Sequence, residues 1–255
     1  MEKTKNKKDI LEIKYIILPS ELSFADVEYF LPFVSEERRE LIRNFRVESG
    51  KMESLFAGLL ARSEIAVVCN VEKEKLQFMK EENGKPYLAP SFTSGHPYHF
   101  SLSHSNGCIA FVGYDRPIGL DVEKISEDRE RMNIARRFFD VKEYEYILNS
   151  EDSNKTFYEI WTRKEAYLKM TGEGLLGDLK SFCALDQEKY WSKSENGYQF
   201  SVCSESFSEN SILQHKEDYS KQTAQNCRSN YSGQIRLKKL DYDQILNRFG
   251  SVRCF

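Results

Sequence analysis

Two acidic residues interrupt an apolar segment near the middle of the chain, in Gly119-Leu-Asp121-Val-Glu123. Side chains alternate between the two faces of a β-strand, so in a strand Asp121 and Glu123 point the same way and Val122 points the opposite way. Two carboxylates on one face can bind a cation or accept a proton. Such a pair is more often a solvated face of a sheet, so a second element has to support any chemical role.

The segment Trp161-Thr-Arg-Lys-Glu165-Ala-Tyr-Leu-Lys169 lies about forty residues further on and has the spacing of a helix. In a helix, Trp161, Glu165 and Lys169 form one row, each a turn from the next. If this helix packs across the strand, the carboxylates of Asp121, Glu123 and Glu165 meet the ammonium group of Lys169. An exposed Glu/Lys pair at this spacing is the plainer alternative.

The combination of three acids and a lysine favours one kind of chemistry. Mg²⁺ is a hard cation that proteins hold through a few carboxylates, water and substrate phosphates. The two segments together therefore indicate phosphate chemistry.

Composition limits the other possibilities. The chain has 255 residues, 40% hydrophobic and 30% charged, as expected of a soluble globular protein with one large or two small domains. Its formal net charge of −3 gives no general attraction to nucleic acid or to an anionic membrane. Any anion site must therefore be local.

The termini and cysteines suggest where the protein works. No apolar run approaches the roughly 20 residues that a membrane-spanning helix needs. Residues 10–17 contain Glu12 and Lys14, unlike the apolar part of a signal peptide, and alternate as a strand does. The six cysteines are scattered without a C-x-x-C pair, so zinc ligation is not indicated. We expect a cytoplasmic protein.

The first part of the chain shows a regular succession of elements. Ser35 is placed to cap a basic helix over residues 35–45, and Met52, Leu55, Phe56, Leu59 and Leu60 have the spacing of a longer amphipathic helix. Gly58 in that helix indicates a close approach by a neighbouring element. The dipeptide Asn83-Gly84 predicts a hairpin, with Lys85 directly after its turn.

Strands are expected at 99–104, 108–114 and 118–122. Ser103 and His104 then end one strand close to the strand that carries Asp121. A hydroxyl and an imidazole beside carboxylates can donate hydrogen bonds to a phosphate. A Ser/His/Asp hydrolase is a poorer interpretation because the chain has no G-x-S-x-G segment.

In the second part, residues 127–149 are expected to be helical with a break near Phe139-Asp140. The helix that carries Glu165 is expected to end at Thr171-Gly172. Further strands are expected at 182–185 and 198–203. Residues 204–234 are rich in Ser, Asn, Gln and Lys and are interpreted as a flexible insertion, after which the tail docks back on the globular part.

These segments resemble the paired signatures of the Sfp-type 4′-phosphopantetheinyl transferases. Gly119–Glu123 and Trp161-x-x-Lys-Glu-Ala-x-x-Lys169 match the two main motifs. Gly84-Lys-Pro86, Ser103-His104 and Arg137-Phe-Phe139 with Glu143 match further segments in the expected order. The resemblance spans about residues 35–203, and its motifs are specific in combination although each is weak alone.

The resemblance implies an α+β, sandwich-like fold. In this family two similar subdomains form a pseudo-dimer, each an antiparallel sheet with packed helices, and the active site lies between them. The division expected here is residues 1–117 for the N-terminal subdomain and 118–255 for the subdomain with the metal site. A single chain carrying both signatures suits a monomer.

The resemblance also implies the reaction. The family moves phosphopantetheine from coenzyme A to a serine of an acyl or peptidyl carrier protein, giving the holo carrier and adenosine 3′,5′-bisphosphate. By motif, Mg²⁺ would be held by Asp121, Glu123 and Glu165. Catalysis would fall to Glu165, as proton acceptor, and Lys169, as the group that stabilises the leaving phosphate. Coenzyme A would be contacted by Lys85, Ser103, His104, Lys164 and Lys169.

One position departs from the family pattern. The family has an arginine before the Ser-Leu-x-x-Gly segment that binds the 3′-phosphate of coenzyme A, and here that position is Glu53. Lys51 or arginines such as Arg38 are the candidates to replace it. Discrimination between coenzyme A and dephospho-coenzyme A is therefore an open property of this chain.

Two other functions stay open at this point. The same acids would suit a Mg²⁺-dependent pyrophosphate hydrolase that uses water in place of a serine. A non-catalytic module that binds carrier proteins is the other alternative. The presence of Asp121, Glu123, Glu165 and Lys169 together argues against it, because a protein without catalysis has no physical reason to keep unpaired acids at one place.

Overall fold

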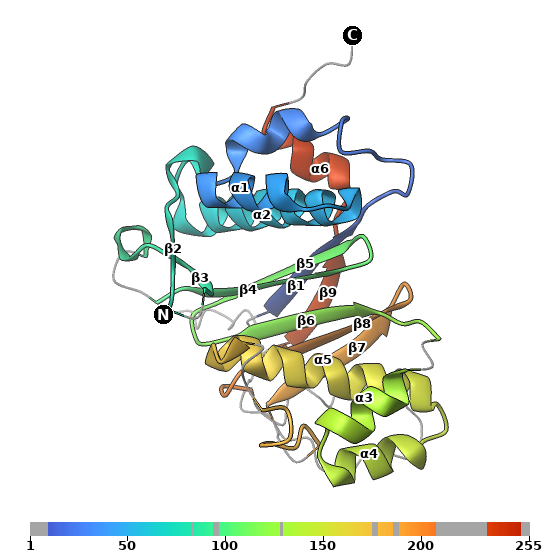
Figure 1. Ribbon diagram of the computed structural model, residues 1–255. Coiled ribbons are helices and arrows are strands. Elements are labelled where there is room, and N and C mark those ends of the chain that lie inside the picture. The colour runs from blue at the N-terminus through green and yellow to red at the C-terminus, as the bar shows by residue number, and fades with distance from the viewer. Residues whose placement is uncertain are drawn as a thin grey trace, which may run out of the picture.

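Two sheets, each covered by helices on its outer face, pack against each other in the computed structural model (Figure 1). The structure describes residues 10–82, 84–93, 97–127, 130–174, 178–185, 189–207 and 234–250. From top to bottom in Figure 1, the layers are helices, first sheet, second sheet and helices.

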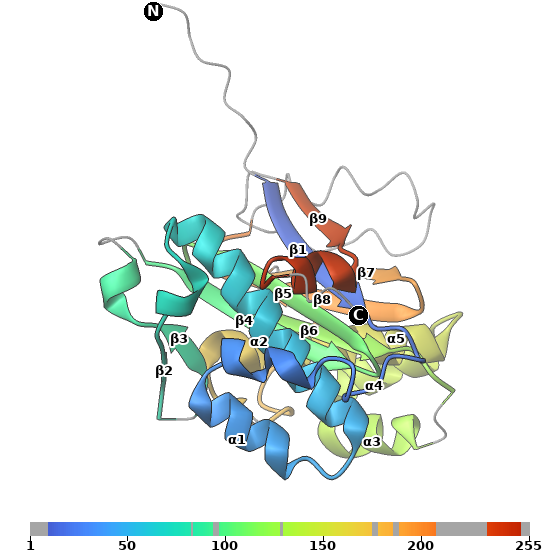
Figure 2. The ribbon, with the colours of Figure 1, turned by 90° about the horizontal axis from the view of Figure 1, so that it is seen from above.

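The first sheet has the strand order β4-β5-β1-β9. Its strands are β1 (Ile10–Ile17), β4 (His99–Ser105), β5 (Cys108–Tyr114) and β9 (Gln234–Lys239). The helices over it are α1 (Glu36–Asn44), α2 (Glu48–Cys69) and α6 (Tyr242–Asn247). Seen from above, α2 lies over the strands of this sheet (Figure 2).

The second sheet has the order β6-β8-β7 and is antiparallel. Its strands are β6 (Gly119–Lys124), β7 (Tyr190–Glu195) and β8 (Tyr198–Cys203). The helix α5 (Ser153–Thr171) packs on it, and α3 (Arg131–Phe138) and α4 (Val141–Leu148) pack on α5.

Short elements connect the helices and strands of the N-terminal part. The hairpin of β2 (Phe78–Lys80) and β3 (Pro86–Leu88) is antiparallel, as the Asn83-Gly84 dipeptide predicted. Three 3₁₀ turns cover Glu28–Phe33, Lys73–Lys75 and Pro90–Phe92. Ser35 caps α1 by accepting a hydrogen bond from the Arg38 N–H, which confirms the predicted start of this helix.

Apolar side chains fill the two kinds of interface between these layers. One cluster lies between α1, α2, α6 and the first sheet, and includes Phe56, Leu60 and Phe111. Another lies between the two sheets and includes Val122 and Phe200. Val122 is buried there, while its neighbours Asp121 and Glu123 contact residues of other elements, as the alternation of a strand requires.

The predicted α+β fold of two similar halves is confirmed, with one difference in strand direction. Strand β9 pairs with β1 in parallel, whereas the other pairs are antiparallel. A strand that reaches the sheet through a long connection is not bound to the antiparallel direction that a hairpin imposes. The predicted boundary at 117/118 falls between β5 and β6, and β9 and α6 return to the N-terminal half.

The strand predicted at 182–185 is wrong. The Lys164 ammonium group donates hydrogen bonds to the carbonyl oxygens of Leu179 and Phe182, and the Glu143 carboxylate accepts one from the N–H of Ala184. These backbone groups are therefore bound to side chains and do not form a ladder. The third strand of the second sheet is instead β7, which pairs with β8 across a turn at Asn196-Gly197.

Most of the predicted insertion at 204–234 lies outside the described residues. The part that is described does not behave as an insertion, because Ser204 and Phe207 are each 1% exposed. Within the described ranges, no helix is long and apolar enough to cross a membrane.

Candidate active site

The helix α5 comes unusually close to β6 at Gly119. A β-carbon at this position would overlap the carbonyl oxygen of Ala166 and lie 2.6 Å from the backbone nitrogen of Met170. Glycine is therefore required where the helix crosses the strand. The crossing brings Glu165 and Lys169, the neighbours of these two residues, to the acidic face of β6.

Asp121 is the centre of the contacts that result. Its side chain is buried, and its Oδ1 accepts hydrogen bonds from Lys169 Nζ at 2.7 Å and from Ser103 Oγ at 2.8 Å. Lys169 Nζ also lies 2.9 Å from Ser103 Oγ. The other oxygen, Oδ2, is buried without a hydrogen-bond partner among the described residues. A buried carboxylate oxygen left in this way is a ready ligand for a cation.

Glu123 lies one pleat further along the same face. Its Oε2 accepts a hydrogen bond from Ser105 Oγ at 2.7 Å. A hydrogen bond with the Trp161 side chain lowers the pKa of the same carboxylate. Burial raises the pKa of Glu123, and the charge of Asp121 raises it further. Glu123 and Asp121 therefore lie close enough for their charges to repel each other.

Glu165 completes the acidic cluster. Burial raises the pKa of Glu165 to about 7, with further increases from Asp121 and Glu123 and a decrease from Lys169. A carboxyl group with this pKa can accept and release a proton near neutral pH. The charges of Asp121, Glu123 and Lys169 thus all act on Glu165, and the role of the three acids as metal ligands stays a prediction.

The strand β6 is held beside β4 by serine side chains. The hydroxyls of Ser101, Ser103 and Ser105 accept hydrogen bonds from every second N–H group of β6, those of Leu120, Val122 and Lys124, at 3.0 to 3.2 Å. The edge strands of the two sheets are therefore joined through side chains. We call this row the serine ladder.

The acids fit a divalent cation by their chemistry. Within the ranges that the structure describes, no group of three His, Cys, Asp or Glu side chains is arranged so that it could hold a metal ion. The ammonium group of Lys169 instead neutralises Asp121. The orphaned Oδ2 of Asp121 and the mutual repulsion of the acids are what a bound Mg²⁺ would relieve.

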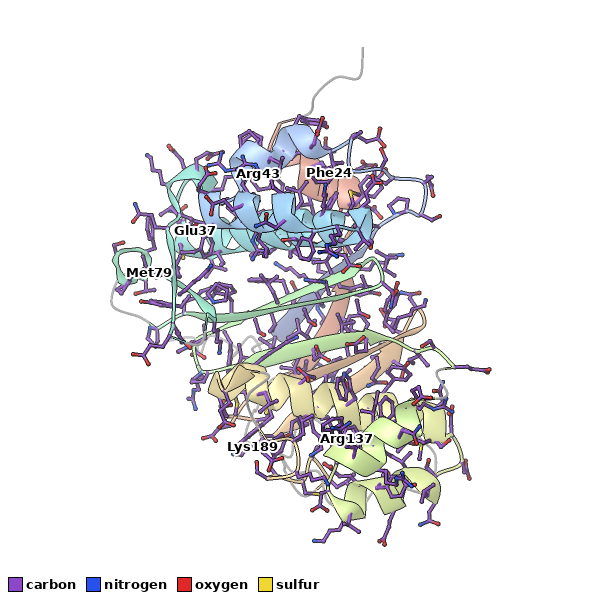
Figure 3. All side chains as sticks on the ribbon, viewed as in Figure 1. Phe24, Glu37, Arg43, Met79, Arg137 and Lys189 are labelled. Carbon is purple, nitrogen blue, oxygen red and sulfur yellow. The ribbon has the colours of Figure 1, made fainter. Side chains whose placement is uncertain are left out.

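A pocket of about 490 Å³ opens between α1, α2 and the β2–β3 hairpin. Figure 3 labels two of its lining residues, Glu37 on α1 and Met79 on β2, which lie on the same side of the N-terminal half. The pocket is lined by apolar residues such as Leu41, Phe78 and Leu102 and by the cations Arg38, Arg62 and Lys80. Apolar walls with a few charges are typical of small-molecule sites.

Lys85 connects this pocket with the acidic cluster. It stands between Gly84 and Pro86, which both line the pocket, and its Nζ lies 3.3 Å from the carbonyl oxygen of Met170. Met170 follows Lys169 on α5, so the lysine reaches across from one half to the other. Burial lowers the pKa of Lys85.

The two other predicted cations differ in their surroundings. Arg38 lines the pocket and donates to the carbonyl oxygen and hydroxyl of Ser54. Its side chain packs on Gly58, which confirms the close approach predicted there. Lys51 lies over the ring of Phe24, 5.6 Å from its centre, and does not line the pocket.

Glu53 and His104 form a pair. Glu53 Oε2 lies 2.8 Å from His104 Nδ1, and Glu53 Oε1 accepts the N–H of Gly107 at 2.7 Å. Burial alone would raise the pKa of Glu53, but the hydrogen bonds from His104 and Gly107 hold it below its ordinary value. A carboxylate therefore stands beside the histidine that the family resemblance assigns to a phosphate.

The structure does not bring Lys164 to the acids. This side chain is fully buried, 2.8 Å from Glu143 Oε2, and it donates to the carbonyls of Leu179 and Phe182. Lys164 thus holds α4, α5 and residues 178–185 together. Glu143 also caps α4 by accepting the N–H of Asp140.

Two contributors to the site were not found from the sequence. Ser105 binds Glu123, and Gly119 allows the crossing. A signal for the first was present, because the serines at 101, 103 and 105 alternate along one strand and so share one face.

Comparisons with known proteins match both halves of the chain. The model of the 4′-phosphopantetheinyl transferase superfamily matches residues 117–225, and the model of the 4′-phosphopantetheinyl transferase N-terminal region matches residues 20–115. The chain is 33% identical over 174 residues to the 4′-phosphopantetheinyl transferase Sfp of Bacillus subtilis, covering 68% of this chain and 75% of that protein.

Two further relatives carry the same description. The 4′-phosphopantetheinyl transferase psf-1 of Bacillus pumilus is 35% identical over 162 residues, covering 62% of this chain and 66% of its own. The 4′-phosphopantetheinyl transferase HetI of a Nostoc species is 37% identical over 136 residues, covering 52% of this chain and 53% of its own.

Proposed function

The chain belongs to the 4′-phosphopantetheinyl transferase superfamily, and we propose that its transfer of phosphopantetheine from coenzyme A to carrier proteins takes place where α5 crosses β6. The observation that carries this proposal is the contact of Lys169 Nζ with Asp121 Oδ1 at 2.7 Å, beside Glu123 and Glu165. Phosphoryl transfer depends on positioning and on neutralising charge, and this cluster offers both kinds of group.

The pocket between α1, α2 and the hairpin is the proposed site of the adenosine end of coenzyme A. Its apolar walls suit a base, and Arg38 and Lys80 offer positive charge for phosphate. Lys85 stands between this pocket and the C-terminal end of α5. The pyrophosphate would then lie along Lys85 toward Lys169.

The acids are the proposed holders of the metal. Asp121, Glu123 and Glu165 would bind Mg²⁺, which when bound neutralises and polarises the pyrophosphate. Asp121 offers the oxygen that has no hydrogen-bond partner among the described residues. Ser103 donates a hydrogen bond to Asp121, and a hydrogen bond with the Trp161 side chain lowers the pKa of Glu123.

The reaction itself moves one proton and exchanges one bond. The carrier's serine oxygen attacks the phosphorus next to the pantetheine, and the bond from that phosphorus to the bridging oxygen breaks. Glu165 accepts the serine proton, and Lys169 stabilises the departing adenosine 3′,5′-bisphosphate. The nucleophile belongs to the carrier, so this chain needs no activated nucleophile of its own.

Intact-mass analysis of a carrier protein tests the proposal. A purified apo carrier is incubated with the chain, coenzyme A and Mg²⁺, and in parallel with EDTA. We expect the carrier to gain the mass of one phosphopantetheine, and the gain to disappear with EDTA. Free phosphopantetheine without modified carrier would indicate a hydrolase, and carrier binding without any product would indicate a non-catalytic module.

The same sample addresses the organisation of the chain. We propose that it acts as a monomer whose halves are residues 1–117 and 118–255, with β9 and α6 packed on the first half. Size-exclusion chromatography with light scattering during the assay would give a mass near 29.9 kDa. A mass of twice that value would contradict the monomer.

A further inference from the structure

The three serines of the serine ladder accept the same kind of hydrogen bond but differ in whether their own hydroxyl proton is donated to a carboxylate. Each hydroxyl accepts a backbone N–H of β6. Ser105 also donates to Glu123 Oε2 at 2.7 Å, whereas Ser101 has no carboxylate partner among the described residues. Both serines are buried. The chain thus contains a matched pair of positions, one with a link to the acidic cluster and one without.

We propose that Ser105 is a positioning residue that holds the Glu123 carboxylate in the orientation needed for a divalent cation. This inference rests on the proposed function. It means that Ser105, a residue of the N-terminal half, sets the orientation of the Glu123 carboxylate in the C-terminal half.

The direction of the Ser105 hydroxyl supports this role. A hydroxyl has one proton to donate and two lone pairs to accept with. The Lys124 N–H lies 3.2 Å from Ser105 Oγ, and Asn106 Nδ2 lies 3.5 Å from it, so both approach from the acceptor side. The proton is left for Glu123. Lys124 follows Glu123 directly in β6. The same strand therefore provides both the N–H that fixes the Ser105 hydroxyl and the carboxylate that this hydroxyl orients.

The effect on a metal follows from how ligands are held. A carboxylate that is free to rotate must lose that freedom when it binds a cation, whereas a carboxylate fixed by a hydrogen bond has already lost it. Removing such supporting groups lowers metal affinity or activity by about 10- to 100-fold in known metal sites. The Trp161 side chain holds the same carboxylate as well, so we expect the lower end of that range.

The test compares three substitutions in the full chain. Ser105→Ala and Ser101→Ala each remove one buried acceptor for a β6 N–H, so their thermal stability should fall by similar amounts. Ser105→Thr keeps a hydroxyl at the same position. Binding of Mn²⁺ to the chain without substrates is measured by electron paramagnetic resonance, and the Mg²⁺ midpoint of carrier modification is measured in parallel.

We expect Ser105→Ala to weaken Mn²⁺ binding and to raise the Mg²⁺ midpoint by about tenfold. Ser101→Ala should stay within about twofold of the unaltered chain, and Ser105→Thr should restore both values. Equal effects of Ser105→Ala and Ser101→Ala would overturn the proposal, because the ladder would then be only structural.

The result is separable from a failure of the proposed function. If the unaltered chain modifies no carrier or ignores EDTA, the proposed function fails, whatever the variants do. If it modifies carriers in a Mg²⁺-dependent way and the two alanine variants agree, only the role of Ser105 fails. Should Ser105→Ala not fold, Ser105→Cys replaces it, since a thiol of similar size is a weak donor.

Discussion

The ammonium group of Lys169 lies 2.7 Å from Asp121 Oδ1 and 2.9 Å from Ser103 Oγ. It thereby joins the last turn of α5 to β6 of one sheet and β4 of the other. The same hydroxyl donates to Asp121 and accepts the N–H of Val122. The contact is therefore both a part of the proposed site and a link between the two halves.

Replacing Lys169 separates binding from chemistry. We expect Lys169→Ala to lower kcat by roughly 10²- to 10³-fold, as is typical for removing a group that stabilises developing charge, with a smaller change in KM for coenzyme A. Steady-state kinetics with a carrier protein measure both values, and Lys193→Ala on β7 serves as a surface control. A change confined to KM would take Lys169 out of the transition state.

Glu165→Gln is expected to stabilise the chain while it abolishes transfer. Because burial raises the pKa of Glu165 to about 7 from an ordinary value of 4.5, the folded chain binds this proton more tightly than the unfolded chain. The stability that this group contributes is therefore fully present below about pH 4.5 and is lost as the pH rises through about 7.

In EDTA at pH 8, the substitution should raise the free energy of unfolding by roughly 1–2 kcal/mol, after discounting the shift for solvent screening. The gain should vanish near pH 4, where the carboxyl is protonated in both states. Urea unfolding at the two pH values measures it. Equal stability of the two chains at pH 8 would contradict the strained acidic cluster.

Gly119→Ala tests the crossing of α5 and β6. The added methyl group overlaps backbone atoms of Ala166 and Met170, which cannot turn aside as a side chain can. We expect a loss of stability of about 1–3 kcal/mol and a fall in transfer of about 10²-fold, since displacement by about 1 Å is enough for that. Gly50→Ala is the control, because the nearest atom to its added methyl group, at 2.8 Å, belongs to the Phe45 ring, which is a side chain and not backbone. Full activity of Gly119→Ala would show that the crossing is not tight.

The sequence predicted the elements whose signal is local. The Ser35 cap, the hairpin at Asn83-Gly84 and the helix of Trp161 to Lys169 each depend on short-range geometry, and each is found. The hairpin of β7 and β8 was missed although Asn196-Gly197 has the same dipeptide, with positive φ at both residues. Most residues of β7 are polar, so this segment lacks the apolar pattern by which a strand is recognised.

What could not be predicted depends on contacts between distant residues. Residues 182–185 look like a strand, but the backbone groups of Phe182 and Ala184 are hydrogen-bonded to the side chains of Lys164 and Glu143. The contact of Ser105 with Glu123 depends on two sheets meeting edge to edge, with a register that no periodicity gives. Periodicity fixes which face a side chain takes, while its partner on that face is set by tertiary packing.

Glu53 is expected to influence the choice of coenzyme A. A carboxylate beside His104 repels a phosphate that the histidine would bind. We expect Glu53→Gln, which keeps an acceptor for the Gly107 N–H, to raise kcat/KM for coenzyme A by roughly 3- to 10-fold, or about 1 kcal/mol. Dephospho-coenzyme A should change little. If both substrates gain equally, Glu53 acts on the fold and not on the 3′-phosphate.

Lys164 is predicted to act on stability and not on coenzyme A. Its pair with Glu143 is fully buried, so removing the lysine leaves an uncompensated charge in the interior. We expect Lys164→Met to lower the free energy of unfolding by about 3–5 kcal/mol. Lys189→Met, which removes an exposed pair with Glu205, should cost less than about 1 kcal/mol.

The double substitution Lys164→Met with Glu143→Leu should recover part of the loss, because no charge is then left unpaired. At a temperature where Lys164→Met is folded, KM for coenzyme A should stay within about twofold of the unaltered chain. Urea unfolding and steady-state kinetics on the same samples decide the matter. A tenfold rise in KM with unchanged stability would show that Lys164 contacts the phosphates of coenzyme A, as the family resemblance implies.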